Sequence, residues 1–164
     1  MNKIIESGVC RLGDPFILAE NGTYYMYATT ARTEKHGLQT GFDVHIAEKL
    51  EGPWTNAGGC LETVSWSADL FWAPEVYKRG GKYYMFFTTR HKDTKKLQIA
   101  AAIADNPLGP FTDLGRPLFA TDYSVIDSSV YFEGNDAWLY YVKDVSDNVS
   151  DGVHVSQIYL SLIH

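Results

Sequence analysis

Short runs in which apolar and polar residues alternate recur along this chain, separated by turn residues. Alternation with a period of two predicts β-strands, because successive side chains of a strand point to opposite faces of its sheet. Asn21 and Gly22 lie between the first two runs, and Asn-Gly in that place is a strong hairpin signal, since both residues tolerate a positive φ. A polar loop at 31–40 and a Gly-Pro-Trp turn at 52–54 come later. The four strands that this pattern predicts are at 15–19, at 23–30, at 42–47 and near Thr55.

The same plan returns twice, in altered form. Turns at 79–81 and at 133–136 join the first two strands of the second and third copies. Gly109-Pro110-Phe111 has the place in the second copy that Gly52-Pro53-Trp54 has in the first (109 − 52 = 57). Self-similarity at a nearly constant spacing predicts a repeat architecture. The strands expected are 76–77, 83–89 and 97–103 in the second copy, and 129–132, 138–143 and 155–163 in the third.

Aligning the second strands of the copies places Asp14, Ala73 and Asp127 at one equivalent position (73 − 14 = 59 and 127 − 73 = 54). A unit of four short antiparallel strands is the blade of a β-propeller, so the fold class predicted is all-β, a propeller. Three consecutive alanines would also permit a helix at 99–103, but this run is too short for a stable helix and aligns with a strand. The blades are expected at about 10–58, about 70–115 and about 125–164, the third being incomplete.

Two and a half to three blades do not close a propeller, which typically has about 4–8. The first and last blades are then left with uncovered faces and open strand edges, which favour association. Either the chain is a fragment of a longer protein or a truncated gene product, or copies of it assemble with one another. We favour the first interpretation, and self-association through exposed blade faces is the second.

Composition supports a folded β protein and argues against several functional classes. The chain has 164 residues, 45% hydrophobic and 14% aromatic, which suits one domain with a sizeable core. A net charge of −6 argues against a nucleic-acid partner, and no run approaches the ~20 apolar residues of a membrane span. The N-terminus lacks the ~7–15-residue apolar core of a signal peptide, so we expect a cytoplasmic rather than a secreted protein. Cys10 and Cys60 are expected to be reduced thiols, with a single disulfide as the alternative.

Asp14 and Asp127 are the first candidates for chemistry. In a propeller the innermost strand of each blade lines the central axis, so residues at equivalent positions of those strands converge. Two carboxylates in one funnel raise each other's pKa, and paired carboxylates are what hydrolysis of a glycosidic bond requires. The alternative is that each aspartate is a turn or cap residue that hydrogen-bonds its own backbone. Their matching repeat positions favour the catalytic interpretation.

Three motifs, in order and at blade spacing, carry a resemblance to a known family. They are Gly13-Asp14-Pro15-Phe16-Ile17 with residues 22–27, Trp72-Ala73-Pro74-Glu75-Val76, and Ile126-Asp127-Ser128-Ser129 within residues 125–132. Over essentially its whole length, the chain resembles the first three blades of glycoside hydrolase family 43. The resemblance implies a five-bladed propeller. It also implies inverting hydrolysis of β-xylosides or α-L-arabinofuranosides in pentose-containing plant polysaccharides or oligosaccharides. We expect no cofactor, since no zinc-like Cys/His spacing and no nucleotide-binding glycine loop occurs in the sequence.

The resemblance also implies roles for the two aspartates. Asp14 matches the family's general base, and Asp127 matches the residue that adjusts the pKa of the general acid and orients it. The acid itself is a glutamate of a fourth blade, beyond this chain, so the chain alone is expected to be inactive. Glu51, in a Glu-Gly-Pro sequence, imitates the acid motif but lies in an outer turn, and we reject it. A non-catalytic carbohydrate-binding propeller is the alternative function, and a protein-interaction propeller ranks last.

Trp72 and Glu75 are weaker candidates, for substrate binding. Trp72 would form an apolar wall at the funnel mouth, or equally well pack between blades. Glu75 could reach the axis, although a structural hydrogen bond or ion pair is the favoured interpretation. The loop residues His36, Arg90 and His91 are expected to be solvated. No Cys/His spacing predicts a metal site, while a structural cation on the axis, such as calcium, stays open.

Overall fold

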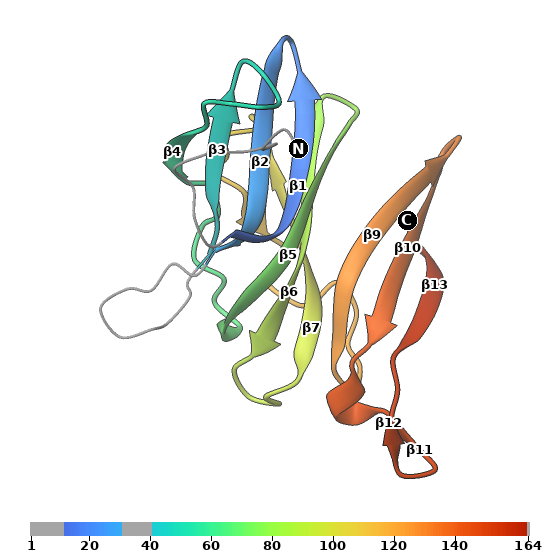
Figure 1. The fold of residues 1–164 in the computed structure, drawn as a ribbon. Helices are drawn as coiled ribbons and strands as arrows, with labels where there is room; N and C mark the ends of the chain where they lie inside the picture. The colour runs from blue at the N-terminus through green and yellow to red at the C-terminus, as the bar shows by residue number, and fades with distance from the viewer. Residues whose placement is uncertain (1–11, 31–40, 164) are drawn as a thin grey trace, which may run out of the picture.

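The computed structural model describes residues 12–30 and 41–163, and nearly all regular structure in them is β (Figure 1). The all-β prediction is therefore confirmed. The elements are β1 (Leu12–Glu20), β2 (Thr23–Thr30), β3 (Asp43–Ala47), β4 (Thr55–Gly59), β5 (Ser67–Arg79), β6 (Lys82–His91), β7 (Leu97–Ala104), β8 (Thr112–Asp113), β9 (Val125–Glu133), β10 (Asp136–Lys143), the 3-10 helix η1 (Val145–Asp147), β11 (Val149–Ser150), β12 (Val153–His154) and β13 (Gln157–Ile163).

These strands form three antiparallel sheets in the orders β1-β2-β3-β4, β5-β6-β7-β8 and β9-β10-β13. We call them blades 1, 2 and 3, and Figure 1 shows them following one another across the molecule, from blue to red. Strands β11 and β12 form a separate small hairpin. A parallel bridge between Leu61 and Phe111 joins the segment that leaves blade 1 to the outer edge of blade 2.

The first hairpin has the turn that its sequence predicts. Asn21 and Gly22 have φ angles of 49° and 77°, the left-handed conformation that suits Asn-Gly between two strands. This turn pairs Glu20 with Thr23 and so sets the register of β1 against β2. With that register, Phe16 and Leu18 lie on the same face of β1 and pack into the core between blades 1 and 2.

The core lies between the blades. Tyr27, Phe42 and Val44 of blade 1 are buried against a set from blade 2 that includes Phe87, and the Phe42 and Phe87 rings meet edge to face at 5.4 Å. A second cluster joins blade 2 to blade 3 and contains Phe86, Ala101, Val130 and Leu139. Since complete burial of a large apolar side chain contributes about 1.5–3 kcal/mol, these two interfaces hold the sheets face to face.

Three segments differ from, or add to, the sequence-based expectation. The alternative of a helix at 99–103 is wrong, because these residues lie within β7, where Ala100 and Ala102 are buried in the core. The inner strand of blade 2 starts at Ser67, well before the expected 76–77. The polar loop after β10 contains η1 and the β11–β12 hairpin, so β13 begins at Gln157 rather than at 155. Local side-chain bonds explain this loop, as Asp144 caps η1 by accepting a hydrogen bond from the Ser146 amide at 2.9 Å.

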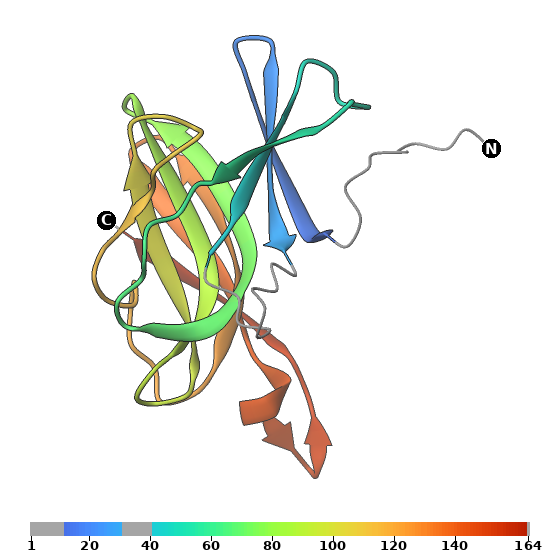
Figure 2. The same cartoon turned by 90° about the vertical axis from the view of Figure 1, so that its left-hand side faces the viewer.

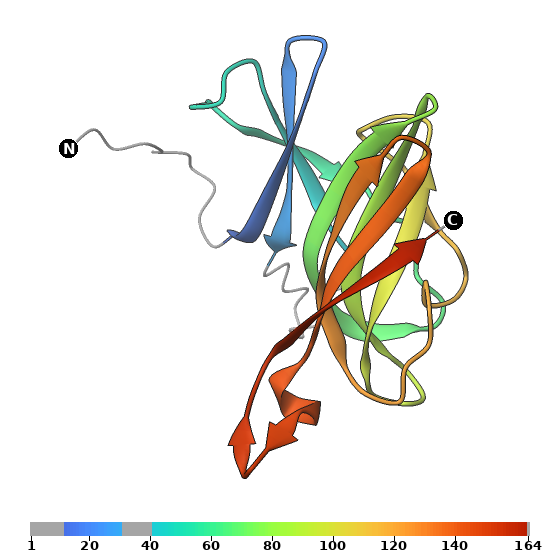
Figure 3. The same ribbon diagram turned by 90° about the vertical axis from the view of Figure 1, so that its right-hand side faces the viewer.

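The three inner strands, β1, β5 and β9, start at the same end of the molecule. Figures 2 and 3 show that the β11–β12 hairpin projects from this end as well. Residues of the inner strands that are far apart in the sequence are therefore brought near one another, since β5 contacts both β1 and β9. No helix within residues 12–30 and 41–163 is long and apolar enough to span a membrane.

Candidate active site

One backbone feature repeats in every inner strand, near the start of β1 and of β9 and in the middle of β5. Asp14, Ala73 and Asp127 have φ angles of 47°, 43° and 54°, all in the left-handed region. The strand register shifts at each of these places, which marks a β-bulge. A bulge bends its strand and re-aims a side chain, and bulges are common beside active sites. The three positions that the sequence repeat aligned therefore share one unusual conformation.

Asp14 is exposed and is held by a threonine of the neighbouring strand. The hydroxyl Oγ1 of Thr29, on β2, donates to Oδ2 of Asp14 at 2.7 Å. The same Oγ1 accepts the backbone N–H of Ala73, in blade 2, at 2.8 Å. One hydroxyl thus links the Asp14 carboxylate to the left-handed residue of the next blade.

Asp127 is held through its backbone, and its carboxyl group lies among other acids. Its N–H donates to Oγ1 of the buried Thr88 at 3.1 Å. Partial burial raises the pKa of Asp127 above its ordinary value, and the negative charges of Asp14, Asp144 and Glu75 raise it further. Asp14 and Asp127, from separate blades, therefore lie within electrostatic reach of each other.

Asp144 was missed by the sequence analysis. It directly follows β10, which runs antiparallel to β9 and so returns the chain to the end where Asp127 lies. The repeat spacing could have found it, because Asp144 follows Asp127 at the same interval at which Arg90 follows Ala73 (144 − 127 = 90 − 73 = 17). The end of each second strand is therefore a place to search for polar residues near the site.

Glu75 is already engaged in a contact between blades 2 and 3. Its Oε2 accepts a short hydrogen bond from the Tyr77 hydroxyl, which in turn accepts the backbone N–H of Val130 at 3.0 Å. Burial, and next the hydrogen bond to Glu75, raise the pKa of Tyr77 to about 12, so this hydroxyl keeps its proton. The favoured structural interpretation of Glu75 agrees with these bonds, and contact with a substrate stays a prediction.

Trp72 is half-buried and lies on β5 opposite Thr88, next to the left-handed Ala73. Arg90, expected to be solvated, instead pairs with the Asp69 carboxylate through Nε at 2.6 Å and through Nη2. This pair links β5 to β6 just before Trp72. Whether Trp72 contacts a sugar stays a prediction.

The remaining loop candidates have different surroundings. The ring of His91 lies over the buried Trp66, at 5.7 Å between centroids, so it is not freely solvated. His36 and Cys10 lie outside the described residues, whereas Cys60 is a free, buried thiol whose pKa burial raises to about 12. Glu51 is exposed in the turn between β3 and β4.

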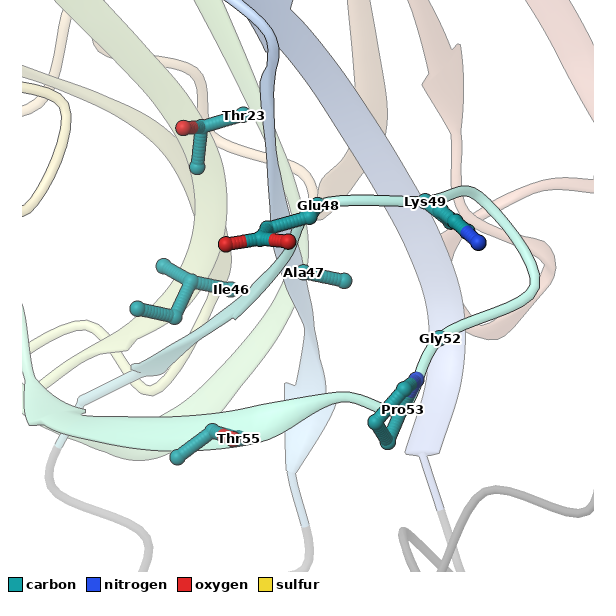
Figure 4. A pocket seen from close by; sticks show the side chains of 8 residues that line it. All are labelled: Thr23, Ile46, Ala47, Glu48, Lys49, Gly52, Pro53 and Thr55. Atoms are coloured by element: carbon teal, nitrogen blue, oxygen red, sulfur yellow. The ribbon is translucent and has the colours of Figure 1, made fainter.

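A hollow of about 550 Å³ lies on blade 1 and is separate from the carboxylates (Figure 4). Thr23 lines it, and Thr23 pairs with Glu20 at the end of β1 opposite to Asp14. Glu48 is the one acid that lines this hollow among the residues described. The hollow therefore lacks a pair of carboxylates. The full lining consists of Thr23, Ile46, Ala47, Glu48, Lys49, Gly52, Pro53 and Thr55.

A metal site does not emerge from the described part of the chain. No group of three or more His, Cys, Asp or Glu side chains there could hold a metal ion. A structural cation on the axis, which the sequence neither requires nor excludes, is not tested by this result.

Comparison with known proteins decides the family. The model of glycosyl hydrolases family 43 matches residues 9–161. The chain belongs to this family. Among curated members, it is 31% identical over 143 residues to a probable arabinan endo-1,5-α-L-arabinosidase A of Aspergillus flavus, with 81% of this chain and 42% of that protein covered. It is also 31% identical over 141 residues to xylosidase/arabinosidase 43A of Humicola insolens, with 78% and 42% covered.

The fold agrees with this family assignment. A solved thermostable family 43 glycoside hydrolase is 36% identical and superposes with a TM-score of 0.86, over 96% of this chain and 50% of that chain. The prediction of a family 43 glycoside hydrolase with a propeller fold is therefore confirmed. The chain spans about half the length of the relatives that it matches.

Proposed function

We propose that this chain supplies the first three blades of an inverting family 43 glycosidase that acts on arabinan-type or xylan-type sugars. One observation carries the proposal: Asp14 and Asp127 occupy equivalent bulged positions in different blades, and the charge of Asp14 raises the pKa of Asp127. The names of the relatives, an arabinan endo-1,5-α-L-arabinosidase and a xylosidase/arabinosidase, support pentose-containing oligosaccharides as substrates.

In this proposal Asp14 is the general base. Thr29 holds Oδ2, which leaves Oδ1 to face a water molecule. The water oxygen attacks the anomeric carbon from the face opposite to the leaving group, and one of its protons passes to Asp14. The bond between the anomeric carbon and the leaving oxygen breaks, and that oxygen takes a proton from a general acid. Inversion requires the base and acid carboxyl groups to be about 6.5–9.5 Å apart, to admit the water.

Asp127 would act on the general acid rather than on the sugar. A negative charge beside a carboxylic acid raises the pKa of that acid and keeps it protonated at neutral pH. The acid itself, a glutamate, would come from a further blade of the complete protein. We therefore expect residues 1–164 alone to be inactive, and the complete protein to be active.

The test is Asp14→Asn in the complete protein, with nitrophenyl α-L-arabinofuranoside and nitrophenyl β-xyloside as substrates. Loss of a general base is expected to lower kcat by about 10²–10⁴-fold. Glu51→Gln is the matched control, because it also replaces a carboxylate with an amide, in an exposed turn, and should turn over at the wild-type rate. Ordinary turnover by Asp14→Asn would overturn the role of Asp14, and retention of anomeric configuration in the product would overturn inversion.

A carbohydrate-binding propeller without catalysis is the second candidate. In this alternative Asp14 and Asp127 hold sugar hydroxyls instead of activating water. It predicts that the complete protein binds arabino- or xylo-oligosaccharides in calorimetry but releases no reducing ends. Hydrolysis by the wild-type protein would rule it out.

A further inference from the structure

Two threonines repeat with the same spacing as the bulged residues. Thr29 on β2 and Thr88 on β6 are separated along the chain by the same interval as Asp14 and Ala73 (88 − 29 = 73 − 14 = 59). Each accepts, through Oγ1, the backbone N–H of the left-handed residue in the next blade: Ala73 at 2.8 Å and Asp127 at 3.1 Å. The contact is therefore a repeated element of the blade junctions, and not an accident of one loop.

A bulged residue in the left-handed conformation needs such support. The bulge takes its N–H out of the regular ladder, and strained backbone persists only where the surroundings hold it. The threonine hydroxyl supplies the missing acceptor from the neighbouring sheet. The third position of this series is 142 (142 − 88 = 54), and it is a valine. The threonine contact is therefore seen at the junctions between blades 1 and 2 and between blades 2 and 3.

Thr29 does one thing more than Thr88. Because its oxygen accepts the N–H of Ala73, its single hydrogen is free to point the other way, toward Oδ2 of Asp14 at 2.7 Å. The backbone of blade 2 thus sets the direction of a hydrogen bond to a charged acceptor in blade 1. Such a bond restricts rotation of the carboxylate and fixes which oxygen stays open.

We infer that Thr29 is a positioning residue for the Asp14 carboxylate. Its Oγ1 accepts the Ala73 N–H across the junction between blades 1 and 2, and this directs the hydroxyl hydrogen toward Asp14. The inference rests on the proposed function insofar as Asp14 is the base. It adds that the geometry of this base depends on the correct docking of blade 2. Thr29 has two roles, since it anchors a backbone N–H and it orients a carboxylate, whereas Thr88 has only the first. Comparing the two threonines therefore separates the backbone anchor from the orientation of Asp14.

The experiment compares Thr29→Val, Thr29→Ser and Thr88→Val in the complete protein. Thr29→Val keeps the shape and removes the hydroxyl, and should lower kcat roughly 10–100-fold, the effect of one hydrogen bond to a charged group, with KM changed much less. Thr29→Ser restores the hydroxyl and should recover most of kcat. Thr29→Val and Thr88→Val should lower the thermal midpoint by similar amounts, since both free one inter-blade N–H.

Crystal structures of the variants give a readout that does not depend on turnover. The Asp14 carboxylate should leave its place beside residue 29 in Thr29→Val and keep it in Thr29→Ser. Wild-type kcat in Thr29→Val, or equal impairment of the Ser and Val variants, would overturn the inference. If the Val variant does not fold, Thr29→Ala replaces it, with the same expectations.

Failure of the proposed function would look different. In that case the wild-type complete protein itself does not hydrolyse the substrates. The crystal structures of the variants then decide whether Thr29 positions Asp14. An Asp14 side chain that stays in place in Thr29→Val overturns the positioning role, and a displaced one supports it.

Discussion

At the residue scale, the left-handed conformation at positions 14, 73 and 127 is imposed by the fold and does not require an aspartate. Aspartate tolerates a φ near +50° because its short side chain can hydrogen-bond locally, but alanine has no such means. Ala73 nevertheless adopts a φ of 43° at the equivalent position. The bulge, which a threonine anchors at Ala73 and at Asp127, therefore holds this conformation without a carboxylate at position 73, so a carboxylate is not needed to maintain the turn. This argues against the alternative that the two aspartates are simple turn residues.

Asp127 is predicted to destabilise the fold at neutral pH. Its folded-state pKa is raised by burial and neighbouring acids, whereas an unfolded aspartate titrates near ~3.9. The folded state therefore binds its proton more tightly, and stability falls as the pH rises from the unfolded pKa through the folded one. Asp127→Asn should raise the thermal midpoint at pH 7, and this gain should disappear below about pH 4.

Thermal unfolding at the two pH values tests this, with Asp136→Asn, an exposed residue at the start of β10, as the control. An unchanged or lower midpoint of Asp127→Asn at pH 7 would contradict the argument. Combined with lost activity, the expected gain would mark Asp127 as a residue kept for function.

At the scale of elements, the outer turns of blades 1 and 2 are built alike. Gly52-Pro53 and Gly109-Pro110 both carry cis peptide bonds, and both glycines have positive φ, 89° and 82°. In blade 2 the turn also closes against blade 1, because the Phe111 N–H donates to the Cys60 carbonyl at 2.7 Å. The sequence predicted the repeat of the turn, but its second role as a contact between blades comes from the stacking of the sheets.

Gly109→Ala is predicted to be far more damaging than a substitution at an open turn. An added Cβ would lie 2.3 Å from the Cys60 carbonyl oxygen, in a backbone conformation that already disfavours a side chain. We expect a loss of about 3 kcal/mol or more in the free energy of unfolding. Gly80→Ala is the control: its φ is +57° but nothing lies within 4 Å, so it should cost only about 1–2 kcal/mol.

Urea denaturation measures both variants. Equal losses for Gly109→Ala and Gly80→Ala would show that backbone strain, and not the contact with Cys60, decides the effect.

At the scale of the whole molecule, one face of blade 3 is uncovered. Tyr27, Phe86 and Tyr140 occupy equivalent positions (86 − 27 = 59 and 140 − 86 = 54), and their exposures are 0%, 6% and 41%. The first two pack against the next blade, while Tyr140 lies on the free face beside Leu160, its partner in β13. Ile158 and Leu160 are 76% and 51% exposed. Such an apolar face is expected to be covered by a further blade in the complete protein.

Residues 1–164 alone are therefore predicted to self-associate through this face, since an exposed apolar sheet favours association. The mean mass measured by light scattering should rise with protein concentration. The double substitution Ile158→Lys with Leu160→Lys should shift the protein to monomer. Leu50→Lys is the matched control, because Leu50 is also 51% exposed but lies on blade 1, and should leave the association unchanged. A monomer at all concentrations would contradict the prediction.

The sequence by itself determined the local plan: strands, hairpin turns, the repeat, and the equivalence of Asp14, Ala73 and Asp127. These follow from alternation and turn chemistry, which are properties of neighbouring residues. The approach of Glu75 to Asp127, and the two hydrogen bonds that Thr29 makes with Ala73 and Asp14, were decided only by the tertiary structure. They depend on how far one sheet is rotated and shifted against the next, which is set by the packing of whole faces and leaves no signal in any short stretch of sequence.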